Sequence, residues 1–272
     1  MCGRTSLFVP PSVVEERFEA EFRTTFVPRY NIAPRQDLYA IPSDDPDAID
    51  AFEWGFLPQF VDDPEDSPRP INARAETVAE KPYFREAYEH RRCLVLADGF
   101  YEWSGDRGSK EPYRVQREDE QPFAFAGLWE TWTPPEDEDG DGQAAEVASE
   151  EEDGDGQAAA VVSEEEDGDG QAAAVAPEDD ATEDEAVRSL TIITTDSNDV
   201  VAPIHDRMPV ILAADEGERW LADGDTGVLD PFETDPLEAY PVSTAVNDPT
   251  NESPEVIDPI DTEQSGFEEF TD

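Results

Sequence analysis

The chain has 272 residues and a formal net charge of −51, because 69 acidic residues face only 18 basic ones. Five Trp, seven Tyr and 14 Phe residues provide enough apolar surface for a packed core, which excludes a wholly disordered acidic protein. A charge of this size repels itself unless concentrated salt screens it, so we expect a halophilic, salt-rich cytoplasm.

Short strands dominate the predicted elements. In chain order, a helix is predicted over residues 12–22, with Ser12 as its N-cap, and a second helix over 75–90, interrupted near its start by Pro82. Strands are predicted at 37–42, 51–58, 91–103, 112–116, 123–132, 189–198, 208–213 and 237–247, with a short helix at 215–223. Without regular βαβ alternation, this pattern favours an α+β domain whose sheet is mainly antiparallel and partly barrel-like, with peripheral helices.

An acidic repeat interrupts these elements at residues 134–187. Three copies of a 14-residue unit each begin DGDGQAA, and residues 136–187 contain 22 Asp or Glu and no Lys or Arg. The spacing fits neither an EF-hand nor a nonapeptide calcium repeat. Because no apolar stripe is present, we expect a disordered insertion within one domain, 1–247, followed by an acidic tail, 248–272.

The two cysteines have different settings. Cys93 lies in the apolar run CLVLADGF, which predicts a buried, inert thiol, and a disulfide with Cys2 is not expected in a reducing cytoplasm. Cys2 follows the initiator Met, which aminopeptidases remove when the next side chain is small. Cleavage would leave an α-amine and a thiol on adjacent carbons, which is a distinctive reactive pair.

Several polar groups occur at strand ends or turns within apolar surroundings. Each has a structural explanation when taken alone: an amide can cap a helix, a carboxylate can pair with an arginine, and a histidine can be satisfied in a turn. Together with the N-terminal thiol they would form a site with a nucleophile, a carboxylate, an imidazole, an orienting amide and arginines for anions. The residues are Cys2, Arg4, Asn72, Arg74, Glu102, His205 and Arg207.

Cofactor motifs are absent from the sequence. There is no pair of CxxC motifs and no His cluster, so we expect no metal. There is no P-loop and no GxGxxG, so we expect no nucleotide cofactor. The first 18 residues lack the apolar segment of a signal peptide, and no apolar run approaches the ~20 residues of a membrane span. We therefore expect a cytoplasmic protein without membrane contact.

A series of motifs carries a family resemblance. MCGR, YNIAP, WGFLP, INARAET, ADGFYEW, PYRV, FAFAGLWE, TTDSN, IHDRMPVIL and VSTAVN occur in this order between residue 2 and about 247. They resemble the SOS-response-associated peptidase family, whose members shield abasic sites by crosslinking to single-stranded DNA. The acidic repeat departs from the family pattern, but it lies away from every motif.

The resemblance implies a β-rich α+β domain, here expected as a monomer, with a DNA groove that leads to Cys2. By matching position, the implied catalytic residues are Cys2, Asn72, Glu102 and His205. The implied DNA contacts are Arg4, Arg74 and Arg207, with Trp54 and Trp103 near the groove. The expected partner is single-stranded DNA that contains abasic sites.

The aminothiol suggests a mechanism. The free amine would attack the ring-opened aldehyde of an abasic site to give a Schiff base, and the thiol would close a five-membered thiazolidine. We expect Glu102 to move protons, His205 to assist opening of the sugar ring, and Asn72 to hold the amine or the sugar. The arginines would bind phosphates while the Trp rings stack on bases, so recognition would not depend on base sequence.

Three alternatives remain open from the sequence. A Cys followed by Gly also begins class II glutamine amidotransferases, in which the thiol attacks an amide. A Cys, His and Glu site could hydrolyse peptides, if only to remove a residue ahead of Cys2. The protein could also bind single-stranded DNA without forming a covalent bond.

Overall fold

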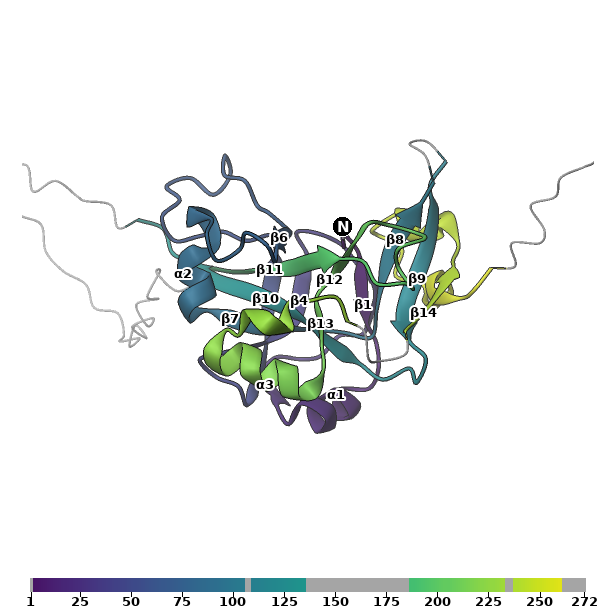
Figure 1. The fold of residues 1–272 in the computed structure, drawn as a ribbon, viewed down its shortest axis with the longest axis horizontal. Coiled ribbons are helices and arrows are strands. Elements are labelled where there is room, and N and C mark those ends of the chain that lie inside the picture. Colours follow the sequence, from purple (N-terminus) through teal and green to yellow (C-terminus); the bar gives the residue numbers. More distant parts are fainter. Residues whose placement is uncertain (1, 106–108, 136–185, 233–236, 261–272) are drawn as a thin grey trace, which may run out of the picture. The chain divides into compact units, whose positions relative to one another are not determined.

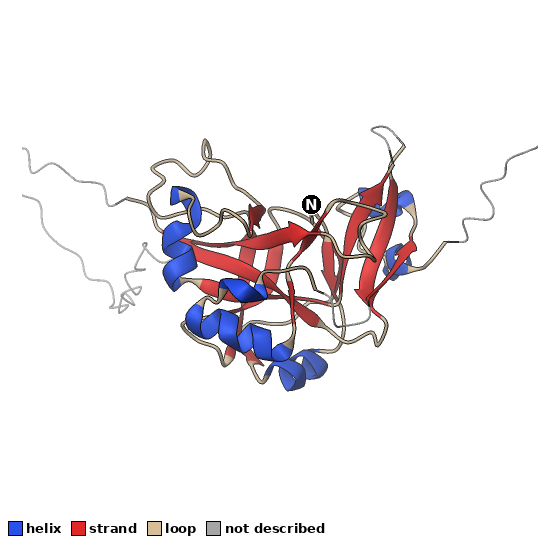
Figure 2. Ribbon diagram, in the orientation of Figure 1, coloured by secondary structure: helices blue, strands red, loops and turns tan. Residues whose placement is uncertain are grey.

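The computed structural model describes residues 2–105, 109–135, 186–232 and 237–260 (Figure 1). Strands make up most of the regular structure in these residues (Figure 2). None of the helices in this part of the chain is long and apolar enough to cross a membrane.

The elements follow the chain in a mixed order of strands and helices. The strands are β1 Thr5–Leu7, β2 Glu21–Phe22, β3 Arg29–Ile32, β4 Asp37–Pro42, β5 Ala48–Trp54, β6 Asn72–Arg74, β7 Arg92–Ala97, β8 Gly99–Ser104, β9 Glu111–Arg117, β10 Phe123–Trp132, β11 Val187–Asp196, β12 Arg207–Pro209, β13 Ile211–Leu212 and β14 Leu237–Pro241. The helices are α1 Pro11–Phe18, α2 Pro82–His90 and α3 Ala214–Asp223, with short 3₁₀ helices η1 Thr226–Val228, η2 Thr244–Asn247 and η3 Pro254–Ile257.

The larger sheet closes on itself. Strands β11, β10, β7, β4 and β5 are antiparallel neighbours in this order, and a parallel pairing of β11 with β5 completes the ring. The short strands β2, β6, β12 and β13 extend the sheet at its edges. Antiparallel pairs predominate, which confirms the expected α+β class with a barrel-like sheet.

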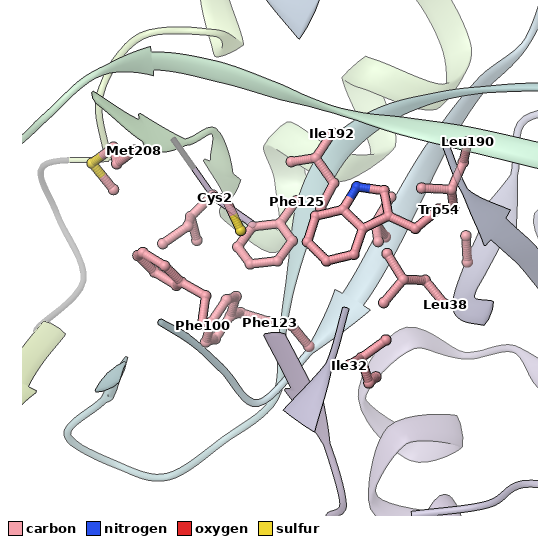
Figure 3. Close-up of a cluster of buried hydrophobic side chains, with 14 of the residues drawn as sticks. Cys2, Ile32, Leu38, Trp54, Phe100, Phe123, Phe125, Leu190, Ile192 and Met208 are labelled. Atoms are coloured by element: carbon pink, nitrogen blue, oxygen red, sulfur yellow. The ribbon is translucent and has the colours of Figure 1, made fainter. Parts of the chain in front are cut away.

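A smaller sheet carries the beginning of the chain. Its order is β14-β9-β8-β1-β3, and every neighbouring pair is antiparallel. Strand β1, three residues after Cys2, lies between β8 and β3. The hydrophobic cluster inside the barrel continues onto one face of this sheet, because Trp54, Phe125, Phe100 and Cys2 belong to the same buried group (Figure 3).

The continuous apolar run of β7 follows from burial on both faces. Cys93 and Val95 face the barrel interior, whereas Leu94 and Leu96 belong to a second cluster that includes Trp220 of α3. Side chains alternate between the two faces of a strand, so a strand covered on both sides needs apolar residues at every position.

The helices are shorter than the apolar spacing predicted. Helix α1 ends at Phe18 because Glu19 adopts a left-handed conformation with a φ of 54°. Ser12 lies inside this helix and does not cap it, since the N-cap position is Pro10. Helix α2 begins only at Pro82, whose fixed φ suits the first helical position.

The predicted strand over 91–103 is two strands joined at Asp98. This buried carboxylate accepts hydrogen bonds from the Ser6 hydroxyl at 2.6 Å and from the backbone N–H groups of Phe8 at 2.5 Å and Val9 at 3.1 Å. The turn at Asp98 therefore joins the barrel strand β7 to β8 of the smaller sheet. The short strands β1, β3 and β6 were not expected from the sequence.

The chain beyond Asn247 packs against the smaller sheet as far as residue 260. The Glu252 carboxylate accepts hydrogen bonds from Arg29 Nε at 2.6 Å and from the Tyr30 backbone N–H at 2.9 Å. Val256 is buried in η3. The expected boundary of an acidic tail at 248 is therefore too early, because this segment contributes to the core; residues 261–272 lie outside the described residues.

The ends of the acidic insertion meet in the larger sheet. Strands β10 and β11 are antiparallel neighbours, and their pairing extends to Trp132 opposite Val187. Most of the expected insertion, residues 136–185, lies outside the described residues. The described flanks show that it connects two adjacent strands.

Candidate functional site

Cys2 is held at the edge of the core by the strand that follows it. Thr5 pairs with Phe100 of β8, and the Arg4 carbonyl accepts a hydrogen bond from the Tyr101 N–H at 2.9 Å. The Cys2 side chain points into the apolar cluster and has no exposed surface (Figure 3). Burial raises the pKa of the thiol far above its usual range, and the charge of Glu102 raises it further, so the group is stored as a neutral thiol.

Glu102 lies on the Cys2 side of β8. Successive side chains of a strand alternate between faces, so Glu102 shares a face with Phe100, which packs in the same cluster as Cys2. The carboxylate is 2% exposed, and burial raises its pKa to about 6. Near neutral pH it is therefore largely ionised, yet it is a much stronger proton acceptor than an ordinary glutamate.

Asn72 contacts Cys2 directly. Its Nδ2 donates a hydrogen bond of 2.8 Å to the Cys2 carbonyl, and the residue lies on β6, which pairs in parallel with β11. Its Oδ1 is buried and has no hydrogen-bond partner among the described residues. Asn72 therefore does not cap a helix; it presents an unused acceptor beside the first residues of the chain.

His205 follows a turn that begins at Asn198. The Arg207 backbone N–H donates to His205 Nδ1 at 3.0 Å, so in the neutral ring the proton is on Nε2. Burial lowers the pKa of His205 and favours this neutral form. Asp206 Oδ1, 3.0 Å from Nδ1, acts in the opposite direction, but its side chain is 89% exposed and well screened, so burial dominates.

Lys110 belongs to the same neighbourhood although the sequence analysis did not select it. Burial is the largest influence on the pKa values of Glu102 and His205, and the Lys110 ammonium is among the charges that lower both. The available signal was compositional, because Lys81 and Lys110 are the only two lysines in the chain.

The three candidate arginines differ in exposure and in the partners that their guanidinium groups contact. Arg74 is exposed and has no ion-pair partner among the described residues. Arg4 donates to Asn31 Oδ1 at 2.6 Å and to the Val246 carbonyl at 2.5 Å. Of the three, Arg74 alone has an exposed guanidinium that makes no hydrogen bond or ion pair with the described residues.

Arg207 is the most heavily engaged of the three. Its guanidinium pairs with both carboxylate oxygens of Glu76, with Asp196 at 3.0 Å and with the Thr194 carbonyl at 2.6 Å. Its side chain is only 11% exposed. Contact between Arg207 and a DNA phosphate would require the Glu76 and Asp196 carboxylates to give way.

The two candidate tryptophans lie in different environments. Trp103 is partly exposed, donates to Asn247 Oδ1 at 2.8 Å and lies 5.9 Å from the Arg4 guanidinium. Trp54 is wholly buried in the barrel and donates to the Ile71 carbonyl at 2.9 Å. The expected position of Trp54 near an open groove is therefore corrected, because its ring is part of the core and has no face for a base.

Phe60 is an exposed aromatic residue that the sequence analysis missed. It is 61% exposed and packs edge-on against Tyr83 with ring centroids 5.7 Å apart. Its position in a Pro-rich stretch directly after the WGFLP motif was the available signal. As for metals, no three His, Cys, Asp or Glu side chains gather as a ligand set within the described ranges.

Asn72 is bonded to the Cys2 carbonyl, and Glu102 lies on the face of β8 that packs in the Cys2 cluster. The charge of Lys110 acts on both Glu102 and His205. A buried thiol, a carboxylate of raised pKa, a neutral imidazole and an unpaired amide oxygen are the components of a nucleophilic site with its own proton acceptor.

Comparison with known proteins gives consistent results. A model of the family "SOS response associated peptidase (SRAP)" matches residues 1–249. The abasic site processing protein YoqW of Bacillus subtilis is 33% identical over 269 residues, covering 95% of this chain and 99% of YoqW. The abasic site processing protein HMCES of Xenopus tropicalis is 26% identical, covering 94% of this chain and 78% of HMCES.

A solved structure shares the fold. The crystal structure of a protein from Bacteroides thetaiotaomicron superimposes with a TM-score of 0.71 at 24% identity, covering 95% of this chain and all of that one. The family match extends over most of the chain and includes every residue of the site. The chain belongs to the SOS response associated peptidase family.

Proposed function

We propose that this protein processes abasic sites in single-stranded DNA by forming a covalent thiazolidine through Cys2 after removal of Met1. Relatives in its family are named abasic site processing proteins. The observation that carries the proposal is the pair of groups that act on Cys2. The Asn72 amide donates a hydrogen bond to the Cys2 carbonyl, and the charge of the Glu102 carboxylate acts on the Cys2 thiol.

The reaction joins the DNA to two atoms of Cys2. Once Met1 is removed, the α-amine adds to the aldehyde carbon of the ring-opened abasic sugar, and the carbinolamine loses water to give an imine. The thiol then adds across the C=N bond: sulfur bonds to carbon and the thiol proton passes to nitrogen. Because both groups belong to one residue, the second addition is intramolecular, which favours ring closure.

Glu102 supplies the proton transfers. Burial keeps the Cys2 thiol neutral, so its addition to the imine requires a base. With a pKa near 6, Glu102 can accept a proton from the amine or the thiol at neutral pH and return it to the departing hydroxyl. A lower pKa would make it a weaker base, and a higher one would leave it protonated.

Asn72 orients the reacting groups, and His205 assists opening of the sugar ring. The unpaired Asn72 Oδ1 can accept a hydrogen bond from the new amine or from a sugar hydroxyl, while its Nδ2 holds the Cys2 carbonyl. His205, neutral with a proton on Nε2, can donate to the ring oxygen of the closed sugar as the aldehyde opens.

DNA contacts are assigned by exposure. Arg74 is available to a phosphate without losing another partner, and Trp103 and Phe60 present aromatic surface for stacking. Arg4 and Arg207 would contribute only by exchanging existing partners. Because phosphate contacts and stacking carry no sequence information, we expect recognition to rest on the lesion and on single-stranded character.

The test is denaturing gel electrophoresis with an abasic single-stranded oligonucleotide. We expect the wild type to give a shifted, heat-stable band that is absent with Cys2→Ala. An oligonucleotide whose aldehyde has been reduced to the alcohol is the matched control and should give no adduct. A wild-type protein with a confirmed N-terminal cysteine that gives no adduct would contradict the proposal.

We also infer that the same site can release its own N-terminus. The reactive amine exists only after the peptide bond before Cys2 is cleaved, and Glu102 lies beside that position as a base. Mass spectrometry of a chain extended by a short N-terminal peptide should show cleavage that depends on Cys2 and Glu102. Unchanged cleavage in both Cys2→Ala and Glu102→Gln would show that the extension is removed by another protease.

A further inference from the structure

Arg114 is a buried cation that the reaction described above does not use. It lies on β9 opposite Tyr101 of β8, and its side chain is 1% exposed. The guanidinium lies 5.4 Å from the ring of Phe8 and 5.7 Å from that of Tyr101. Burying a guanidinium is costly unless each donor finds a partner, so its contacts require an explanation.

The side chain of Arg114 crosses one strand to reach the next. Its Nη1 donates to the Ser6 hydroxyl of β1 at 2.7 Å, and its Nη2 donates to the carbonyl and carboxylate of Asp98 at 3.1 and 3.3 Å. The crossing point is Gly99, where a Cβ atom would lie 2.4 Å from the guanidinium. Only glycine leaves room for this path, so β9, β8 and β1 are joined through one side chain.

Asp98 completes the connection from the other side. One carboxylate oxygen accepts from Ser6, and the other accepts from the backbone N–H groups of Phe8 and Val9. The Asp98 backbone N–H donates to the Ser6 carbonyl at 3.0 Å. Asp98 and Arg114 thus hold β1 through both its backbone and its Ser6 side chain.

The clamp, defined as Arg114 and Asp98, joins the two strands that lie next to or carry the reacting groups, β1 and β8. Strand β1 begins three residues after Cys2, and β8 contains Glu102 four residues after Asp98. A buried ion pair is often no more stabilising than apolar residues of the same size, but it fixes one arrangement because each donor needs its own acceptor. A shift of β1 along β8 would move the thiol away from the carboxylate.

We propose that Arg114 and Asp98 are positioning residues that hold Cys2 beside Glu102 and keep its thiol sealed in the core. This inference rests on the proposed function for its catalytic consequence. It also has a consequence that needs no DNA: loosening the clamp should expose the Cys2 thiol, which is fully buried in the intact protein.

The chain supplies a matched control for Arg114. Arg92 is also buried, but its guanidinium binds backbone carbonyls at the ends of α2 and α3, including those of Tyr88 and Trp220, away from β1. Arg114→Met and Arg92→Met therefore remove the same atoms from two buried settings. Arg114→Lys retains the charge near Asp98 and serves as the second variant if Arg114→Met does not fold.

The first measurement is alkylation of Cys2 by iodoacetamide in a Cys93→Ala background, without DNA. We expect Arg114→Met to react at least tenfold faster than the parent and Arg92→Met to react at the parental rate per folded molecule. Equal rates for Arg114→Met and the parent would overturn the inference, whether or not the proposed function holds.

The second measurement separates positioning from DNA binding. With abasic single-stranded DNA at saturation, Arg114→Met should form adduct at least tenfold more slowly, and the midpoint of its rate against pH should move from the wild-type value. Its affinity for an oligonucleotide with a tetrahydrofuran abasic analogue, which has no aldehyde, should stay within twofold. A wild-type rate and pH profile in Arg114→Met would contradict the inference, whereas absence of adduct in the wild type would contradict the proposed function instead.

Discussion

The barrel and the smaller sheet each bury one cysteine, and the two thiols differ in their neighbours rather than in their burial. Cys93 and Cys2 are both fully buried with raised pKa values. Burial alone raises the pKa of Cys93. The Cys93 Sγ packs closely against β10, because a Cβ atom added at Gly127 would lie only 2.9 Å from it. Cys2 has a carboxylate and an amide beside it. We therefore expect the neighbouring proton acceptor to distinguish Cys2 from Cys93 in the proposed reaction.

The same contrast applies to the buried arginines. Arg92 near the barrel satisfies backbone carbonyls at two helix ends, which is favourable for a cation at the negative end of a helix dipole. Arg114 in the smaller sheet pairs with a carboxylate and a hydroxyl across strands. Arg92 joins helices α2 and α3 to the barrel, whereas Arg114 joins strands β9, β8 and β1 of the smaller sheet.

The largest expected effect tests the difference between the cysteines. Cys2→Ala should abolish the denaturant-resistant adduct, because the thiol that closes the ring is gone. Cys93→Ala should retain the adduct and lose about 1 kcal/mol of stability, as a small buried deletion does. Gel shifts with abasic DNA and chemical denaturation measure both. Loss of adduct in well-folded Cys93→Ala would break the comparison.

Glu102→Gln should slow adduct formation roughly 10²- to 10⁴-fold, because it removes the base beside the thiol. In the wild type the rate should rise with pH through about 6 as Glu102 ionises. Single-turnover kinetics measure both effects, over a pH range that extends roughly one unit or more to each side of that pKa. A pH-independent wild-type rate would assign the base elsewhere.

The same substitution should also stabilise the fold above pH 6. The folded-state pKa of Glu102, about 6, exceeds its ordinary value of 4.5, so the folded protein holds the proton more tightly and the wild type loses stability as pH rises between these values. The loss amounts to about 2 kcal/mol by linkage. Denaturation midpoints should favour Glu102→Gln at pH 8 and converge with the wild type near pH 4.

Arg92→Met should destabilise the protein by about 3 kcal/mol, because it leaves several buried carbonyls without their charged donor. Thermal denaturation monitored by circular dichroism measures the loss. The rate of adduct formation per folded molecule should not change, since Arg92 lies outside the smaller sheet. A slowed reaction in the folded fraction would show that the barrel end also positions the site.

The smallest effect concerns the surface. Arg74→Gln should weaken binding to single-stranded DNA and reduce the slope of log affinity against log salt by about 0.7, the value for one phosphate contact. Arg207→Gln should change this slope less, because Arg207 is already paired with Glu76 and Asp196. Fluorescence anisotropy at several salt concentrations distinguishes them, and a larger slope change for Arg207→Gln would reverse the assignment.

The components of the site could be predicted from sequence because they occur in short motifs with unusual residue types. Their arrangement could not. Asn72 reaches Cys2 only because the three-residue strand β6 pairs with β11, which begins more than 100 residues later in the chain. A strand of this length has no hydrophobic period, so neither the element nor its contact has a local signal.

The burial of Trp54 and the pairing of Arg207, neither of which was expected from the sequence, share one cause. Aromatic rings and guanidinium groups have the same local sequence signal whether they face solvent or the interior. Trp54 faces inward because β5 closes the barrel against β11, and Arg207 is covered because Glu76 and Asp196 come to it from other segments. Long-range pairing, which periodicity does not record, decides both.

The contact between Arg4 and the Val246 carbonyl has a consequence for how the protein is made. These groups are 242 residues apart, and at bacterial-type elongation rates their synthesis is separated by roughly 12 to 50 s. Until Val246 leaves the ribosome, the segment after Cys2 lacks one of its supports. The nascent chain therefore carries Cys2, the nucleophile of the proposed reaction, for most of its synthesis before the surroundings of this residue can be completed.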